Sequence, residues 1–201
     1  MPDDRKVDLI RKETPFQGYF RVDRYHLRHS QFRGGMGPEI SREVFERGHA
    51  GAVVPYDPNT GEIVLIEQFR AGALAANDPD PWLIEIVAGI IEEGETAENV
   101  VLRETEEEAG VAVTDLVSLG THYMTPGGSS ESIAFFAGRC DASSVGGVHG
   151  LLSEGEDIRA FTLPLQEAVD LVLNNRIRNA TAALGILMVH ARLEDLRRRW
   201  V

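Results

Sequence analysis

The segment from Gly89 to Val111, GIIEEGETAENVVLRETEEEAGV, is the stretch of sequence that decides the fold. It joins a glycine-bearing turn to a run whose apolar residues recur at helical spacing. Thr96 is a suitable N-cap for this run, and Gly110 suits the left-handed position that ends a helix. The sequence therefore predicts a helix over residues 96–109 with well-marked ends.

Carboxylates share one face of this predicted helix with apolar residues. At about 100° per residue, Val101, Glu104 and Glu108 fall on one face, and Glu107 lies at its edge. Like charges at this spacing repel each other, and Arg103 can offset only one of them, most naturally Glu107 one turn later. An acidic run is usually a solvated helix face. Here the glutamates continue the buried stripe, which argues against that alternative.

Oxygen-only ligands at this density suit Mg²⁺ or Mn²⁺, which take their remaining ligands from water and substrate phosphates. A metal cluster that clamps a pyrophosphate is the natural consequence. The overall charge agrees with this need for local cations, because the chain has a formal net charge of −12. Such a surface repels polyanions, so we expect no nucleic-acid partner.

The segment also resembles the Nudix box, GX5EX7REUXEEXGU, in which U is an aliphatic residue. The positions that match are Gly89, Glu95, Arg103, Glu104, Glu107, Glu108, Gly110 and Val111. Thr105 departs from the pattern at an aliphatic position, which affects packing rather than a ligand. The resemblance to Nudix hydrolases implies an α/β (α+β) Nudix fold, a mixed β-sheet sandwiched between helices, with an N-terminal antiparallel β extension. It assigns structural roles to Gly89, Glu95, Arg103, Glu107 and Gly110.

The same resemblance implies a set of metal ligands and a catalytic base. Glu104, Glu108, Glu156 and the carbonyl oxygen of Ala88 would hold about two or three Mg²⁺ or Mn²⁺ ions. Glu154 would be the base that activates the attacking water. Without the resemblance, the loop that contains Glu154 and Glu156 would be interpreted as an ordinary solvated acidic loop.

Over nearly its whole length, from about Gly18 to the C-terminal helix, the sequence is similar to the bacterial ADP-ribose pyrophosphatases. The supporting segments are residues 42–50, 64–70, 125–128 and 149–157. The resemblance implies cleavage of ADP-ribose to AMP and ribose 5-phosphate. The substrate-binding residues that it implies are Tyr19, Phe20, Arg42, Glu43, Arg47, Arg70, Ile90, Thr125, Pro126, Gly127 and Glu131.

The arginines and aromatic residues of this set have side chains that suit a diphosphate and an adenine ring. Arg42, Arg47 and Arg70 supply fixed cations for a dianionic diphosphate, although arginines without a special role are common on surfaces. Tyr19 and Phe20 could stack on adenine, and packing within a strand is the alternative.

Pattern and composition outline the rest of the chain. At 201 residues, with 43% hydrophobic and 26% charged residues, the chain is expected to form one globular domain with a modest extension. Alternation over residues 19–27 and a glycine-rich turn near residues 34–38 predict an N-terminal β-meander in residues 1–46, followed by the Nudix domain in 47–201. Further strands are expected at 49–55, 63–69, 82–87, 116–123, 132–138 and 158–163, helices at 165–174 and 180–200, and a long loop at 141–156.

Cysteine content and apolar runs bear on location and assembly. The single Cys140 fits a core position and a reducing compartment. No apolar run approaches a membrane span, so we expect a cytoplasmic protein with no membrane partner. The resemblance further implies a homodimer with exchanged N-terminal strands, in which Tyr19, Phe20, Arg42 and Glu43 serve the opposite subunit.

Two alternatives stay open at this point. The first keeps the chemistry and changes the substrate to another nucleoside diphosphate sugar or to a dinucleotide such as NADH. The second is a regulator that binds ADP-ribose without cleaving it. A regulator of this kind should lack some of the metal-binding glutamates, yet Glu104, Glu107, Glu108 and Glu154 are all present.

Overall fold

The computed structural model describes residues 5–200, apart from the side chain of Glu154. Its internal contacts divide the chain into two compact units. Unit 1 consists of Met1–His49 and Tyr123–Ser132, and unit 2 consists of Ala50–His122 and Ile133–Val201.

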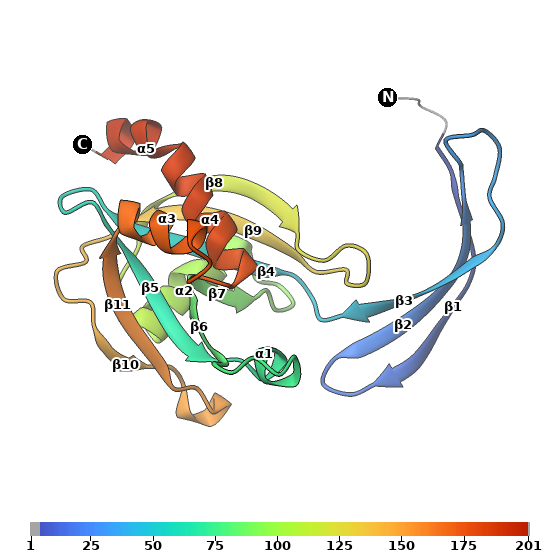
Figure 1. The fold of residues 1–201 in the computed structure, drawn as a ribbon, viewed down its shortest axis with the longest axis horizontal. Coiled ribbons are helices and arrows are strands. Elements are labelled where there is room, and N and C mark those ends of the chain that lie inside the picture. Colours follow the sequence, from blue (N-terminus) through green and yellow to red (C-terminus); the bar gives the residue numbers. More distant parts are fainter. Residues whose placement is uncertain (1–4, 201) are drawn as a thin grey trace. The chain divides into compact units, whose positions relative to one another are not determined.

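Unit 1 is built on a three-stranded antiparallel sheet in the order β1-β2-β3, drawn in blue in Figure 1. The strands are β1 (Val7–Gln17), β2 (Arg21–His29) and β3 (Ile40–Glu46). The turn formed by residues 125–128 packs against the end of β3, where the N–H of Phe45 donates a hydrogen bond of 2.8 Å to the carbonyl oxygen of Gly128. The sheet agrees with the predicted N-terminal antiparallel extension.

A buried aspartate ties β1 to β2. Asp23 is fully buried, and its carboxylate lies 2.8 Å from the Nζ of Lys12 and 3.0 Å from the Nε of Arg21. It also accepts a hydrogen bond of 2.7 Å from the hydroxyl of Thr14. The hydrogen bond from Lys12, together with those neighbours, holds the pKa of Asp23 below its usual value. Polar contacts therefore hold together a sheet that leaves much apolar surface exposed.

Unit 2 contains an eight-stranded sheet with the order β10-β11-β5-β4-β9-β8, to which β6 adds beside β5 and β7 beside β4 (Figure 1). The central strand β4 runs parallel to β9 and antiparallel to β5 and β7, so the sheet is mixed. Its strands are β4 (Ala50–Asp57), β5 (Glu62–Phe69), β6 (Trp82–Glu85), β7 (Val87–Ile90), β8 (Thr114–Tyr123), β9 (Ser132–Arg139), β10 (Gly147–His149) and β11 (Ile158–Pro164).

Helices cover both faces of this sheet. Val53 and Val54 are consecutive in β4 and therefore point to opposite faces. Val53 belongs to the same core cluster as Val101 of α2 (Ala97–Ala109). Val54 instead faces α4 (Ala180–Ala191). It lies so close to Gly185 of that helix that a Cβ atom built on the glycine would be 3.2 Å from Cγ2 of Val54. This arrangement confirms the predicted mixed sheet sandwiched between helices.

The remaining helices are short. They are α1 (Ala71–Ala75), the 3-10 helix η1 (Leu152–Glu154), α3 (Leu165–Leu173) and α5 (Leu193–Trp200). None of the helices in the described part of the chain is long and apolar enough to cross a membrane.

The segment from Trp82 to Ile90 bridges two strands that separate from each other. β4 and β5 pair only at Tyr56 with Ile63 and at Asp57 with Glu62. Farther along, β5 pairs with β6 and β4 pairs with β7, so the chain passes from one strand to the other at the buried Ile86. The single strand predicted over residues 82–87 is therefore wrong, because apolar periodicity does not show which neighbour a strand pairs with.

Two other expectations need correction. The helix predicted over 180–200 is two helices that meet at Arg192, and α5 brings Trp200 into a stacked contact with Tyr56 at 6.1 Å. The long loop predicted over 141–156 contains β10 and η1. Elements this short carry too little periodicity to be recognised.

Cys140 is buried, as expected, and burial raises the pKa of its thiol to about 12. We therefore expect iodoacetamide at about pH 8 to leave the folded protein unmodified, because the thiolate is the reacting form. In guanidinium chloride the thiol should regain its ordinary pKa of about 8.5 and react rapidly. Mass spectrometry measures the extent of alkylation in the folded protein and in the protein unfolded by guanidinium chloride. Equal labelling of the folded and unfolded protein would contradict a buried thiol.

Candidate active site

The helix α2 has the ends that its sequence predicts. The hydroxyl of Thr96 accepts a hydrogen bond of 3.2 Å from the N–H of Asn99, and Gly110 adopts the left-handed conformation with a φ of 63°. Thr105, at the position that departs from the box pattern, is buried, and its hydroxyl donates to the carbonyl oxygen of Val101. The polar atom of Thr105 is thus satisfied within the helix.

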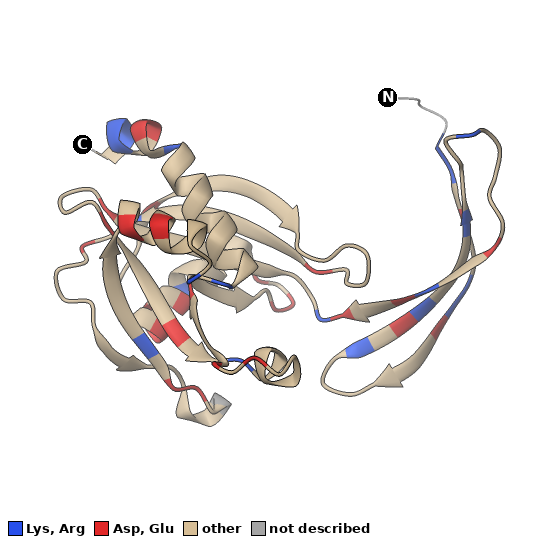
Figure 2. Ribbon diagram, in the orientation of Figure 1, with Lys and Arg blue, Asp and Glu red and all other residues tan. Residues whose placement is uncertain are grey.

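Arg103 holds three glutamates rather than one. Its guanidinium nitrogens lie 2.9 Å from Glu104, 3.0 Å from Glu107 and 3.6 Å from Glu95. The expectation that Arg103 offsets a single glutamate is therefore wrong, although the predicted pair with Glu107 is present. One arginine can serve several carboxylates because its guanidinium presents five N–H donors. Arg103 therefore restrains several of the acidic residues of α2, which are drawn in red on the ribbon in Figure 2.

Glu108 is the most enclosed carboxylate of the group. Its residue is 3% exposed, and it accepts a hydrogen bond of 3.2 Å from the backbone N–H of Ala88 in β7. Burial raises the pKa of Glu108 well above its usual value, and the neighbouring Glu104 and Glu156 raise it further. The N–H of Ala88 and the positive charge of Arg70 act in the opposite direction. Burial and the neighbouring carboxylates therefore disfavour the charged form of Glu108.

Gly89 allows Glu104 to lie against the β7 backbone. A Cβ built on Gly89 would lie 2.1 Å from Oε1 of Glu104 and 2.5 Å from its Cδ. Any side chain at residue 89 would therefore displace this carboxylate. Burial also raises the pKa of Glu104 in spite of the opposing charge of Arg103.

The loop before β11 brings a third carboxylate to the same group. Glu156 is half-buried and accepts a hydrogen bond of 3.0 Å from the N–H of Leu151. Its charge acts on both Glu104 and Glu108. Glu154 ends η1 two residues earlier, and its side chain lies outside the described part of the structure. Its predicted role as catalytic base stays a prediction.

Arg70 has a partner that the sequence did not reveal. Its Nε and Nη2 donate to the two carboxylate oxygens of Glu85 at 2.9 and 2.6 Å, and Glu85 is 4% exposed. The signal available in the sequence was that Glu85 is the only charged residue in the short apolar strand 82–87. This bidentate pair fixes the guanidinium and neutralises much of its charge.

The donor set fits a divalent cation. Carboxylate oxygens are the ligands that Mg²⁺ prefers, and the mutual repulsion of Glu104, Glu108 and Glu156 is the strain that a bound cation would relieve. Among the described side chains, no three Asp, Glu, His or Cys groups lie close enough together to form a complete metal site. Because Glu154 is not among those side chains, the ligand set stays a prediction.

Four of the predicted substrate-binding residues lie together in unit 1. The rings of Tyr19 and Phe20 meet edge to face at 4.7 Å, and Phe20 makes a similar contact with Phe45. The guanidinium of Arg47 lies 5.6 Å from the centre of the Phe20 ring, and its Nε lies 3.2 Å from a carboxylate oxygen of Glu131. Tyr19 is 89% exposed, so its ring is free for stacking.

The other predicted substrate-binding residues are more dispersed. Arg42 is exposed and donates to the carbonyl oxygen of Ser41, while Glu43 pairs with Arg24 at 2.7 Å. Thr125, Pro126 and Gly127 form the turn that adjoins the end of β3 in unit 1. Ile90 ends β7 in unit 2, next to the acidic group.

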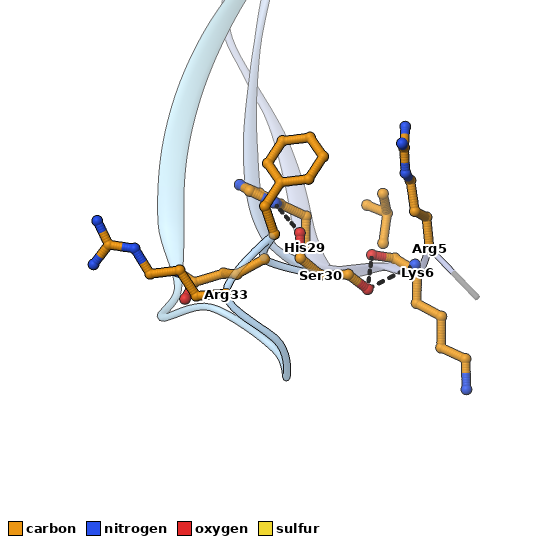
Figure 3. A pocket seen from close by; sticks show the side chains of 8 residues that line it. Arg5, Lys6, His29, Ser30 and Arg33 are labelled. Carbon is orange, nitrogen blue, oxygen red and sulfur yellow. Dashed lines mark hydrogen bonds between the residues drawn. The ribbon is translucent and has the colours of Figure 1, made fainter. Parts of the chain in front are cut away.

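Unit 1 also contains a hollow of 620 Å³ that none of the predicted residues lines (Figure 3). Ser30 closes one side of it, since its hydroxyl accepts a hydrogen bond of 2.9 Å from the N–H of Lys6. Among the described residues, its walls carry basic, polar and apolar groups and no carboxylate, which does not suit a hard divalent cation. The lining residues are Arg5, Lys6, Val7, His29, Ser30, Gln31, Phe32 and Arg33.

Comparison with known proteins places these observations in a family. The chain is 40% identical over 194 residues to an ADP-ribose pyrophosphatase of Escherichia coli (strain K12), covering 96% of this chain and 92% of that protein. It is 35% identical over 198 residues to an ADP-ribose pyrophosphatase of Haemophilus influenzae, covering 96% and 90%. A GDP-mannose pyrophosphatase of Yersinia enterocolitica is 31% identical over 192 residues, covering 95% and 97%.

A solved structure shares the fold, and a family model matches the sequence. The crystal structure of an ADP compounds hydrolase superposes with a TM-score of 0.71 at 21% identity, covering 95% of this chain and 96% of that one. The model of the NUDIX domain matches residues 46–184, which include the whole acidic helix and the loop before β11. Nudix hydrolases generally depend on divalent metal ions. The predicted family is confirmed: this chain belongs to the Nudix family.

Proposed function

We propose that the protein hydrolyses the diphosphate linkage of ADP-ribose and releases AMP and ribose 5-phosphate. The observation that carries the proposal is the group of Glu104, Glu108 and Glu156, two of which lie against the β7 backbone, where burial and mutual repulsion disfavour their charged forms. The two ADP-ribose pyrophosphatases that align with nearly the whole chain support this choice of substrate.

The acidic group is proposed to hold about two or three Mg²⁺ or Mn²⁺ ions. Their ligands would be the carboxylates of Glu104, Glu108 and Glu156 and the carbonyl oxygen of Ala88. When bound, such cations neutralise a diphosphate and make water a better nucleophile. The residues of the box keep these ligands in place, because Arg103 restrains Glu104 and the N–H of Ala88 restrains Glu108.

Hydrolysis requires a group that takes a proton from the attacking water. We assign this step to the carboxylate of Glu154. As a water oxygen forms a bond to one phosphorus, Glu154 accepts the proton. The bond from that phosphorus to the bridging oxygen breaks, and its electron pair stays on the leaving phosphate. A residue on a short loop helix can approach the water after the substrate has bound.

The remaining predicted residues are proposed to bind the rest of the substrate. Tyr19 and Phe20 offer aromatic faces and edges for adenine, and Arg42, Arg47 and Arg70 offer cations for the diphosphate. Because Arg70 already pairs with Glu85, its main effect is expected to be on orientation. The further contacts are assigned to Glu43, Ile90, Thr125, Pro126, Gly127 and Glu131.

Release of AMP from ADP-ribose, measured with Mg²⁺ and with a chelator, tests this function. We expect rapid cleavage by the wild type in Mg²⁺, none in chelator, and a loss of about 10³-fold in kcat for Glu154→Gln. GDP-mannose and NADH run in parallel should be poorer substrates. Faster cleavage of either would keep the chemistry and reassign the substrate, and binding of ADP-ribose without cleavage would identify a regulator.

We also propose that the protein is a homodimer in which residues 1–46 form a dimerising extension of a Nudix domain in residues 47–201. Unit 1 supports this proposal because β1 and the connection between β2 and β3 expose large apolar side chains that a monomer would leave in water. The exposed fraction is 71% for Val7, 53% for Leu9, 58% for Phe16, 97% for Phe32 and 46% for Met36.

If N-terminal strands are exchanged, Arg42 of one subunit serves the active site of the other. We expect Arg42→Ala and Glu108→Gln to be nearly inactive as separate homodimers. A purified heterodimer of the two variants, made with two different tags, should recover about half of the wild-type activity, because one of its two sites is then intact. Activity no greater than that of the separate homodimers would show that each site is completed within one chain.

The protein is further proposed to be cytoplasmic. The support is Cys140, a single buried cysteine, which fits a reducing compartment.

A further inference from the structure

Gln68, near the end of β5, has a buried amide whose nitrogen has no hydrogen-bond partner among the described residues. The residue is 7% exposed, and Nε2 makes no hydrogen bond to any residue in the described part of the chain. A buried donor without an acceptor costs free energy, because the donor has lost its hydrogen bonds to water. Such groups are rare in folded proteins, and each one calls for an explanation.

The direction of the Gln68 side chain follows from strand alternation. Val64, Ile66 and Gln68 point to the same face of the sheet. Val64 and Ile66 belong to the core cluster that also contains Val101 and Ala109 of α2. Gln68 therefore lies on the face covered by α2, at the end of the strand where the apolar cluster stops.

Charged neighbours place this position beside the acidic group. Gln68 pairs with Leu83 across β5 and β6, and Ile66 pairs with Glu85, so Glu85 is the diagonal neighbour of Gln68 on the same face of the sheet. Glu85 binds Arg70, whose positive charge in turn acts on Glu108. The amide of Gln68 thus lies on the same face of the sheet as α2, whose Glu104 and Glu108 are proposed to hold the metal ions.

We propose that Gln68 is a positioning residue whose Nε2 donates a hydrogen bond to an oxygen of the substrate diphosphate, an inference that rests on the proposed function. A bound diphosphate needs donors, whereas ionised carboxylates supply only acceptors. Arg70 already donates to Glu85, whereas the amide nitrogen of Gln68 donates to no side chain or backbone group that the structure describes. A neutral donor also adds no charge that would compete with the cations for Glu104 and Glu108.

The variant Gln68→Met tests this role, because methionine is of similar length and has no amide. We expect kcat/KM for ADP-ribose in saturating Mg²⁺ to fall about tenfold, the loss of one neutral hydrogen bond. The rise in thermal unfolding temperature that ADP-ribose causes should also shrink. Without substrate, the unfolding temperature should stay the same or increase, since an unpaired donor has been removed from the interior.

Gln166→Met is the matched control. It makes the same chemical change on α3, where an exposed amide donates to Asp170, and it should behave like the wild type. A lower unfolding temperature for Gln68→Met without substrate would show that the amide supports the fold, which overturns the inference. Wild-type kinetics and an unchanged shift with ADP-ribose would overturn it as well.

The same measurements separate this inference from the proposed function. If the wild type binds ADP-ribose without cleaving it, the proposed function fails. A smaller thermal shift in Gln68→Met would then still support a donor to the bound diphosphate, and an equal shift would overturn it.

Discussion

Replacing Glu108 by glutamine is expected to lower kcat for ADP-ribose by about 10³-fold, because a lost metal ligand removes several kcal/mol of transition-state stabilisation. The same change should raise the thermal unfolding temperature in chelator. Glutamine keeps the shape of the side chain but cannot carry a negative charge. Glu108 is only 3% exposed and lies near Glu104 and Glu156, so its charge is unfavourable in the absence of metal. Activity and stability should thus move in opposite directions.

The measurement is a pair of assays on each variant, AMP release in Mg²⁺ and thermal unfolding with and without Mg²⁺. Glu106→Gln is the control, because it makes the same change on an exposed position of α2. Mg²⁺ should stabilise the wild type and Glu106→Gln, and it should stabilise Glu108→Gln much less. Near-normal kcat in Glu108→Gln would remove this carboxylate from the metal site.

Gly89→Ala is expected to lower activity by at least about 10²-fold with little loss of stability. The added Cβ would occupy the position of the Glu104 carboxylate, 2.1 Å from Oε1. The backbone of residue 89 has no left-handed φ, so alanine fits the main chain, and the flexible Glu104 side chain can swing away. The fold therefore tolerates the methyl group, but the proposed metal ligand is displaced.

Steady-state kinetics and circular dichroism of Gly89→Ala measure the two effects. Gly72→Ala in α1 adds a methyl group where no atom lies within 4 Å, and it should leave kcat near that of the wild type. If Gly89→Ala keeps full activity, Glu104 can hold its metal from another position, and the close packing against β7 is dispensable.

Local features of the site could be predicted from the sequence. The cap at Thr96, the left-handed Gly110 and the shared face of Glu104 and Glu108 all follow from helical periodicity within one segment. The pair of Arg103 with Glu107 is likewise a contact within one turn. Family resemblance added expectations for residues outside the helix, and their roles remain to be tested.

Features that depend on strand pairing could not be predicted. The pair of Arg70 with Glu85 exists because β5 and β6 lie side by side, and nothing in the local pattern of either strand indicates it. The contact of Arg103 with Glu95 similarly depends on how the turn before α2 folds back. Gln68 had no distinguishing pattern at all, because an unpartnered donor becomes visible only when its surroundings are known.

The bridging segment from Trp82 to Ile90 has a consequence for the order of folding. Its two halves pair with β5 and β4, and β4 in turn pairs with β9, which is distant in the sequence. Such non-local pairings form slowly, because a long loop must be closed before any contact is gained. Ala88 and Gly89 lie in this segment, so their final position against α2 requires both flanking strands. If the proposed metal site is correct, a partly folded chain cannot yet hold the ions, and we expect affinity for them to appear only as folding is completed.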